Sequence, residues 1–231
     1  MGTLQERFSL SVVIPTLNAS ATLPETLAAL HRAAIVGEVV VADGSSADET
    51  VALARSAGAK VVAAARGRGS QLAAGAAAAT GSWLLFLHAD CRLEPGWESA
   101  VGGFLTAPEA ENRAGYFDLA LDDPAAAARR LERLVAWRCR VLALPYGDQG
   151  LLIARTLYDT VGGFAALPLM EDVDLVRRLG RRHLGPIGAR LFASARRYRR
   201  DGYLRRPLRN LLCLLLYFAG VPPARIVRLY G

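Results

Sequence analysis

The chain has 231 residues, 52% of them hydrophobic, so it is long enough for one sizeable core and at most one subdomain. Its formal net charge of +7 comes almost entirely from arginine, a balance that suits anionic partners such as nucleotide phosphates, nucleic acid or anionic lipid. The three cysteines lie far apart and form no CxxC pair, which argues against a disulfide framework and predicts reduced thiols in a cytoplasmic protein.

Strands and helices alternate with short loops through the first half of the chain. Apolar runs predict strands over residues 10–14, 39–42, 61–65 and 83–87, the first ended by Pro15. Helices are predicted between them, over 22–34, 51–57 and 71–80, and capping-box patterns mark the first two, at Thr22 with Glu25 and at Ser46 with Glu49. This alternation predicts an α/β fold with a mostly parallel central sheet, flanked by helices, that binds nucleotides at its strand ends. The glycine fingerprints of dinucleotide dehydrogenases and P-loop enzymes are absent from the sequence, so neither class is expected.

The pattern changes after Gly96. A helix over 97–105, a strand over 115–121, a long arginine-rich amphipathic helix over 124–144 and a strand over 151–154 are expected. The last forty residues are basic, then apolar, then basic again. We interpret residues 1–231 as one domain with a nucleotide-binding half (1–96), an acceptor-binding half (97–200) and a helical C-terminal segment (201–231).

Polar side chains follow three of the predicted strands. Asp90 offers the hard oxygen ligands that Mg²⁺ or Mn²⁺ prefers, and His88 could add a nitrogen ligand or could instead pack behind the site. Asp43 could accept hydrogen bonds from a base or ribose, or could cap the helix that follows it. Asn18 stands at the end of the first strand. These positions predict a ligand site at one edge of the sheet.

Two arginines flank a glycine between the third strand and the next helix. The guanidinium groups of Arg66 and Arg68, placed before a helix N-terminus, are typical of a pyrophosphate site, although arginine is common in this chain.

A second acidic cluster begins at Glu171. If a helix starts there, Asp172 shares a face with apolar residues three, four and seven positions later, so it would point toward the core or a pocket. Partial burial disfavours the charged carboxylate, which would make Asp172 a better base. The alternative is a helix N-terminal carboxylate satisfied by backbone amides. Asp174 instead faces arginines and is expected to form a surface ion pair.

Five ordered segments carry a family resemblance. They are VIPTLN (13–18), VADGSSAD (41–48), RGRGSQL (66–72), LHAD (87–90) and MEDVDL (170–175). In this order they resemble the family 2 glycosyltransferases with the GT-A fold. More narrowly, they resemble a bacterial subgroup associated with radical-SAM and selenium-related domains. The resemblance covers nearly the whole chain.

The resemblance implies an inverting transfer of a sugar from a nucleotide-diphosphate sugar, usually uridine diphosphate-linked, with Mg²⁺ or Mn²⁺. It assigns seven residues to nucleotide binding: Pro15, Leu17, Asn18, Asp43, Arg66, Arg68 and Ala89. It assigns Asp172 and Glu171 to catalysis, with Asp172 as the base. It assigns Asp90 and His88 to the metal, with His88 in place of the usual first aspartate of the D-x-D motif. Asp148 and Gln149 match sugar- or acceptor-contacting positions more loosely. The Q-x-x-R-W motif of processive synthases does not follow Asp172, so transfer of a single sugar is expected.

Two other readings stay open. A nucleotidyltransferase on a related fold would release pyrophosphate, and a non-catalytic nucleotide-sugar-binding protein would release nothing. Nucleic-acid binding is not expected, because no recognisable module accompanies the basic charge. The expected partners are therefore a nucleotide-sugar donor and a small-molecule or lipid-linked acceptor.

Both ends of the chain were considered for membrane targeting or membrane contact. Residues 1–7 lack the features of a signal peptide, and the apolar run over 211–221 is too short for a bilayer, which takes about 20 residues. The basic clusters beside that run could contact an anionic membrane surface, or the helix could pack on the domain with its arginines in water. We expect a cytoplasmic protein that works in solution or at the inner face of the membrane.

Overall fold

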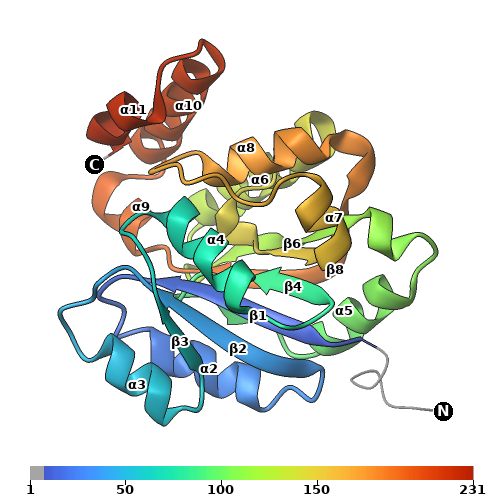
Figure 1. Cartoon of the computed structure of the whole chain (residues 1–231). Coiled ribbons are helices and arrows are strands. Elements are labelled where there is room, and N and C mark those ends of the chain that lie inside the picture. The colour runs from blue at the N-terminus through green and yellow to red at the C-terminus, as the bar shows by residue number, and fades with distance from the viewer. Residues whose placement is uncertain (1–7, 231) are drawn as a thin grey trace.

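The computed structural model describes residues 8–230. The prediction that residues 1–7 are not a signal peptide concerns residues outside this range. An eight-stranded sheet in the order β3-β2-β1-β4-β7-β6-β8-β5 forms the centre, with helices on both faces (Figure 1). The strands are β1 (Leu10–Thr16), β2 (Val36–Asp43), β3 (Lys60–Ala63), β4 (Trp83–Phe86), β5 (Arg92–Leu93), β6 (Ala114–Leu121), β7 (Leu151–Ala154) and β8 (Leu184–Ala193).

The α-helices vary from short connections to the 17-residue α6. They are α2 (Leu23–His31), α3 (Thr50–Ser56), α4 (Arg68–Ala78), α5 (Trp97–Thr106), α6 (Ala126–Leu142), α7 (Arg155–Thr160), α8 (Glu171–Leu179), α9 (Arg196–Asp201), α10 (Arg205–Phe218) and α11 (Pro223–Tyr230). Short 3₁₀ turns cover Ala110–Asn112, Gly147–Gln149 and Arg181–His183.

The first four strands form the parallel half that the alternating pattern predicts. β1 pairs in parallel with β2 and β4, and β2 pairs in parallel with β3. All four residues of β4 are buried, as expected for a central strand covered on both faces. The predicted α/β class with a mostly parallel sheet is confirmed.

The second half makes the sheet mixed. β7 runs antiparallel to both β4 and β6, whereas β8 is parallel to β6 and antiparallel to β5. Neither β5 nor β8 is predicted by the sequence pattern. In β8, Gly185, Pro186 and Gly188 interrupt the apolar alternation that identifies a strand.

Pro15 does not end the first strand, contrary to the sequence prediction. β1 pairs with β2 as far as Thr16, but its pairing with β4 stops at Val13. The missing N–H of Pro15 faces the β4 side, beyond the last rung of that ladder, so it costs no hydrogen bond.

The two predicted capping boxes are wrong. Helix α2 follows Thr22 and α3 follows Glu49, and neither side chain bonds a helix amide. The Ser46 hydroxyl instead donates to an oxygen of Asp43 at 2.5 Å and accepts from the backbone N–H of Asn18 at 2.8 Å. The loop after β2 is therefore held by bonds across two strand ends rather than by a helix cap.

Helix α4 begins at Arg68, three residues earlier than predicted, and two glycines make this possible. Gly67 has a φ of 135°, which L-residues rarely adopt. Gly69 packs directly on the segment before α8, because a Cβ there would lie 2.2 Å from the Ala165 carbonyl oxygen and 2.8 Å from the Leu167 amide. Both contacts are with backbone, which cannot rotate away.

We expect Gly69→Ala to destabilise the fold by about 1–3 kcal/mol or more, because the added methyl overpacks two backbone segments. Gly103→Ala is the matched control, since Gly103 is an exposed glycine inside α5 and a Cβ there would have no neighbouring heavy atom within 4 Å. That change should stabilise by about 0.5–1 kcal/mol through helix propensity. Urea unfolding of both variants gives the two values, and equal values would contradict the packing argument.

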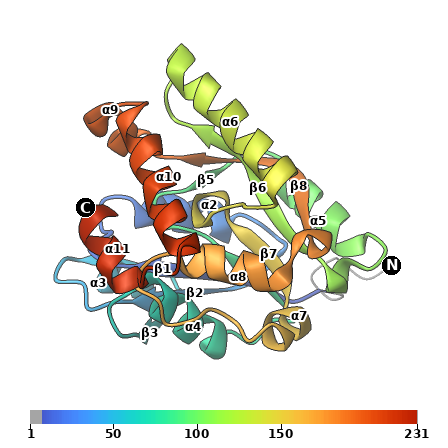
Figure 2. The same ribbon diagram turned by 90° about the horizontal axis from the view of Figure 1, so that it is seen from above.

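The C-terminal helices pack on α8. Cys213 and Leu214 of α10 and Ile226 of α11 are buried with apolar residues of α8 and of the segment before it. The view from above shows α10 and α11 beside α8 (Figure 2). The predicted helical C-terminal segment is thus part of the folded domain. Cys91, Cys139 and Cys213 are all free and buried, as expected for reduced thiols.

Candidate active site

A cleft of about 670 Å³ opens at the carboxyl ends of β1 and β4. One wall comes from the loops after β1 and β4 and from the start of α4, the second from α8, and the third from α9 to α11. The lining residues are Pro15, Thr16, Leu17, Asn18, Ala19, Thr22, Arg66, Gly67, Arg68, Gln71, His88, Ala89, Asp90, Tyr146, Asp148, Leu169, Met170, Asp172, Val173, Ala193, Ser194, Arg196, Arg197, Tyr198, Arg206, Asn210 and Tyr230. This is the edge at which open α/β sheets bind ligands.

Five of the seven residues assigned to nucleotide binding lie together on the first wall or beside it: Pro15, Leu17, Asn18, Arg66 and Ala89. Asn18 has a left-handed backbone with a φ of 51°, and its Oδ1 accepts a hydrogen bond from the Ala47 amide at 2.8 Å. The wall is thereby fixed to the loop after β2. Arg68, the sixth, lies on the same wall at the start of α4.

Asp43, the seventh, lies behind this wall and does not line the cleft. Its side chain is buried, and its oxygens accept hydrogen bonds from the Thr16 hydroxyl at 2.9 Å and the Ser46 amide at 2.8 Å. Burial alone would raise the pKa of Asp43, but the hydrogen bonds from Ser46 and Thr16 together hold it below its usual value. Asp43 is thus an ionised anchor for the loops of the wall.

Gln71 joins the same arrangement and is missed by sequence reasoning, although it lies within the RGRGSQL segment. Its amide Nε2 donates to the carbonyl oxygens of Thr16 at 2.6 Å and Ala42 at 3.1 Å. These two bonds tie α4 to the ends of β1 and β2. The signal for Gln71 is its position as a polar residue on the inner face of an otherwise alanine-rich helix.

Arg68 forms an ion pair with Glu171, with 2.6 Å between Nε and Oε1. The side chain of Glu171 is only 1% exposed, whereas that of Arg68 is 29% exposed and lines the cleft. Burial and the charge of Asp172 raise the pKa of Glu171 to about 7, against the opposing effect of Arg68. Its second oxygen is buried without a hydrogen-bond partner among the described residues. Glu171 therefore sits behind Arg68 and orients it.

Asp172 lies half-buried at the cleft surface, on the α8 face that the helical spacing predicts. Its Oδ2 accepts a hydrogen bond from the Gly147 amide and its Oδ1 one from the Val173 amide, each at 2.7 Å. The alternative of a carboxylate bonded to backbone amides is therefore also present, but these bonds leave Asp172 facing the cleft. Asp174 forms the predicted surface ion pair with Arg178, at 2.7 Å.

His88 lies beside Asp172, and Gly147 separates the two side chains. A Cβ at Gly147 would lie 3.0 Å from His88 Nε2 and 3.3 Å from Asp172 Oδ2. Burial and the charges of Arg68 and Arg197 lower the pKa of His88 to about 3. The imidazole is thus neutral and keeps a lone pair on one ring nitrogen.

Asp90 and Asp148 are the other two carboxylates of the cleft. Asp90 is exposed, whereas Asp148 is half-buried and its Oδ1 has no hydrogen-bond partner among residues 8–230. Burial raises the pKa of Asp148, although Arg138 opposes the shift. Within that range no cluster of three histidine, cysteine or acidic residues is placed to hold a metal ion.

Gln149 does not reach the cleft, unlike its neighbour Asp148. It is 1% exposed, its Nε2 donates to the Phe117 carbonyl at 3.1 Å, and its Oε1 accepts from Arg138 at 3.0 Å. These bonds hold the 3₁₀ turn that carries Gly147 and Asp148 against β6. Gln149 supports the site from behind.

The third wall contains residues that sequence reasoning does not assign to the site: Ser194, Arg196, Arg197, Tyr198, Arg206, Asn210 and Tyr230. Arg206 is buried and pairs with Asp201 at 3.1 Å. Asn210 has a buried Oδ1 without a partner among the described residues. This wall is the most basic part of the cleft.

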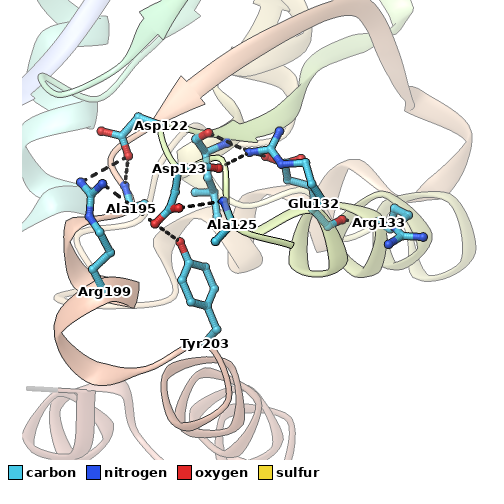
Figure 3. A network of polar contacts seen from close by, with 10 residues as sticks. Asp122, Asp123, Ala125, Glu132, Arg133, Ala195, Arg199 and Tyr203 are labelled. Atoms are coloured by element: carbon cyan, nitrogen blue, oxygen red, sulfur yellow. Dashed lines mark hydrogen bonds and ion pairs between the residues drawn. The ribbon is translucent and has the colours of Figure 1, made fainter. Parts of the chain in front are cut away.

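A polar network anchors that wall to the rest of the domain (Figure 3). The Ala195 amide donates to Asp122 at 2.5 Å, and the Tyr203 hydroxyl donates to Asp123 at 2.8 Å. Arg199 lies between the two carboxylates, 3.7 Å from Asp122 and 3.9 Å from Asp123. The loop between β6 and α6 thereby fixes α9 and the start of α10.

The family model described as glycosyl transferase family 2 matches residues 11–167. The chain belongs to glycosyl transferase family 2. The match includes every site residue on the first wall, whereas α8 and the third wall lie beyond it. A search of curated proteins found no match.

Solved structures show the same fold as this family 2 glycosyltransferase. Glucosyl-3-phosphoglycerate synthase from Mycobacterium tuberculosis, in complex with Mn²⁺, UDP and glucosyl-3-phosphoglycerate, aligns with a TM-score of 0.61 and 20% identity over 95% of this chain and 82% of its own. Mannosyl-3-phosphoglycerate synthase from Rubrobacter xylanophilus aligns with a TM-score of 0.61 and 17% identity over 94% of this chain and 77% of its own. The predicted GT-A architecture is thereby confirmed.

Proposed function

We propose that this chain is an inverting glycosyltransferase that moves a single sugar from a nucleotide-diphosphate sugar to a hydroxyl acceptor. One observation carries the proposal: the carboxylate of Asp172, the carboxylate of Asp90 and the guanidinium of Arg68 line a single cleft. A base, a cation-binding oxygen donor and a cationic diphosphate contact are the three parts that such a transfer needs. The narrower subgroup with radical-SAM and selenium-related domains stays a prediction.

Uridine diphosphate is the nucleotide that we expect. The structurally similar glucosyl-3-phosphoglycerate synthase is described in complex with Mn²⁺ and UDP-glucose, at 23% identity. Here the nucleoside would lie along Pro15, Leu17 and Asn18, and Arg66 and Arg68 would contact the diphosphate. Asp43 would support that pocket through the loop after β2, because its oxygens are already engaged.

The residues present fit a divalent cation that is carried in by the nucleotide. Asp90 is an exposed carboxylate on the cleft surface, and Mg²⁺ or Mn²⁺ can be held by one protein carboxylate when phosphates supply further ligands. His88 is neutral, as a nitrogen ligand must be, and offers a second contact. Such a cation would neutralise charge on the departing diphosphate.

Asp172 would act as the general base. The acceptor hydroxyl oxygen forms a bond to the anomeric carbon while the bond to the diphosphate oxygen breaks, and the hydroxyl proton passes to Asp172. The nucleoside diphosphate leaves with the bonding electrons on the opposite face, which inverts the anomeric configuration. The amides of Gly147 and Val173 hold the carboxylate in place for this step.

The proposal is tested by incubating the protein with UDP-sugars and Mn²⁺, with and without candidate hydroxyl acceptors, and measuring the released products. Free UDP that rises with acceptor supports a glycosyltransferase, and proton NMR of the product reports the anomeric configuration. Pyrophosphate release in a parallel incubation with UTP and a sugar 1-phosphate would indicate a nucleotidyltransferase. Binding of UDP without any release would indicate a binding protein, and either of these two outcomes rejects the proposal.

We expect Asp90→Asn to remove most of the Mn²⁺-dependent gain in UDP affinity, a change of roughly tenfold or more, because the amide is a weaker ligand than the carboxylate. UDP affinity without metal should change little. Asp159→Asn, at an exposed position of α7, is the control. Calorimetric titrations with UDP, each done with and without Mn²⁺, measure the gain. An unchanged gain in Asp90→Asn would place the metal elsewhere.

A further inference from the structure

Helix α10 has a second apolar face that the described chain leaves at the surface. Six large side chains on it and just before it are between 45% and 78% exposed: Leu204, Leu208, Leu211, Leu212, Leu215 and Phe218. Spacings of three and four residues place them on one side of the helix. The opposite side buries Cys213 and Leu214 against α8 and α11. A surface helix of a globular domain needs only the buried face, so the exposed row requires its own explanation.

Arginine surrounds this exposed row. The segment 194–230 contains nine arginines and a single acidic residue, Asp201. Asp201 is already paired with Arg200, Arg206 and Arg209. The exposed arginines of this region are Arg196, Arg197, Arg199, Arg200, Arg205, Arg225 and Arg228. The positive charge of the chain is therefore concentrated around its most apolar surface.

We propose that α10 and its flanking arginines dock on an anionic membrane surface. The leucine row would enter the boundary between headgroups and acyl chains, and the arginines would contact lipid phosphates. Within residues 8–230 no helix is long and apolar enough to cross a membrane, so the helix would lie in the interface. A second copy of the chain is disfavoured as the occupant, because it would bring two arginine-rich surfaces together.

A second exposed apolar row supports the same orientation. Leu134, Trp137, Val141 and Leu142 of α6 are between 44% and 55% exposed. Figures 1 and 2 show α6 and α10 on the same side of the sheet. Tryptophan is enriched at the membrane–water interface, so Trp137 fits a residue at headgroup depth.

Docking would place the mouth of the cleft near the lipid surface, because α9, α10 and α11 also form its third wall. The acceptor would then be a lipid or a lipid-linked molecule. That consequence rests on the proposed function, whereas the docking itself depends only on the surface and is measured without substrate.

Vesicle co-sedimentation tests the apolar row. Vesicles of phosphatidylcholine with phosphatidylglycerol should bind the wild type at low salt, and Leu208→Glu/Leu215→Glu should weaken binding by about tenfold or more. The matched control is Ala28→Glu/Ala52→Glu, which adds the same charge at exposed positions of α2 and α3 on the other side of the sheet (Figure 1). Equal binding of the two variants, or no binding of the wild type, overturns the proposal.

Salt and charge test the arginines. Arg225→Gln/Arg228→Gln should bind the same vesicles several-fold more weakly and with a shallower salt dependence. Arg32→Gln/Arg55→Gln, just after α2 and in α3, should match the wild type. Circular dichroism and urea unfolding confirm that each variant is folded. Light scattering is the competing readout: a wild-type dimer that Leu208→Glu/Leu215→Glu converts to a monomer, without vesicle binding, would assign the row to a second copy and overturn the proposal.

Discussion

Replacing Asp172 by asparagine is expected to reduce sugar transfer by roughly 10²–10⁴-fold, the usual contribution of a general base. The amide oxygen of asparagine can still accept the hydrogen bond from the Gly147 amide, so the side chain keeps its place but cannot take a proton. UDP binding should stay near the wild-type level, because the proposed nucleotide contacts lie on the first wall and not on α8. Turnover at saturating UDP-sugar and calorimetric UDP binding measure the two effects separately.

Asp174→Asn is the matched control for that experiment. Asp174 lies two residues along the same helix and pairs with Arg178 at the surface, so the same chemical change occurs without touching the cleft. Its transfer rate should equal that of the wild type. If Asp172→Asn keeps most of the wild-type rate, Asp172 is not the base, and Asp148 becomes the carboxylate to test next.

The parallel half of the fold could be predicted because each of its strands is a short apolar run bounded by turn residues. β4 is the clearest case, since its burial on both faces follows from an unbroken run after Gly81. β8 could not be predicted, because its glycines and proline break the local pattern. Its parallel pairing with β6 joins residues about seventy positions apart, as in Ala114 with Leu184, and no local signal encodes such a pairing.

Within the site, helical spacing was enough to predict that Asp172 points toward a pocket, but the burial of Asp43 could not be predicted. Its partners Thr16 and Ser46 come from the ends of two neighbouring strands, and their approach depends on the register of the sheet. The residue type correctly indicated a hydrogen-bond acceptor. Only the structure shows that the hydrogen-bond donors to Asp43 are Thr16 and Ser46 of the same chain rather than a ligand.

The third wall could not be predicted for a related reason. Arg206 and Asn210 lie on a helix that is otherwise rich in leucine, and the sequence pattern gives no preference for which face turns to the cleft. That choice follows from the packing of Cys213 and Leu214 on α8. The sequence pattern alone therefore places the arginine clusters at the surface and not in the site.

Replacing Arg68 by methionine is expected to destabilise the fold by about 3–5 kcal/mol at alkaline pH, because it leaves the carboxylate of Glu171 buried without its partner. The matched control is Arg178→Met, which breaks the more exposed pair with Asp174 and should cost within about 1 kcal/mol. Urea unfolding measures both. The double variant Arg68→Met/Glu171→Gln should recover part of the loss, because it removes the buried charge.

The loss of stability in Arg68→Met should grow as the pH rises. The pKa of Glu171 is already raised to about 7 in the folded protein, above its usual value of 4.5, so ionisation of Glu171 costs stability as the pH rises through that window. Removing Arg68 takes away a charge that opposes this shift, so the pKa of Glu171 rises further and the cost at pH 8 grows. At pH 5 Glu171 is protonated in the folded variant, and the deficit relative to the wild type should be smaller. A deficit that is constant between pH 5 and pH 8, or that survives in the double variant, would mean that Arg68 stabilises the fold by packing rather than by neutralising Glu171.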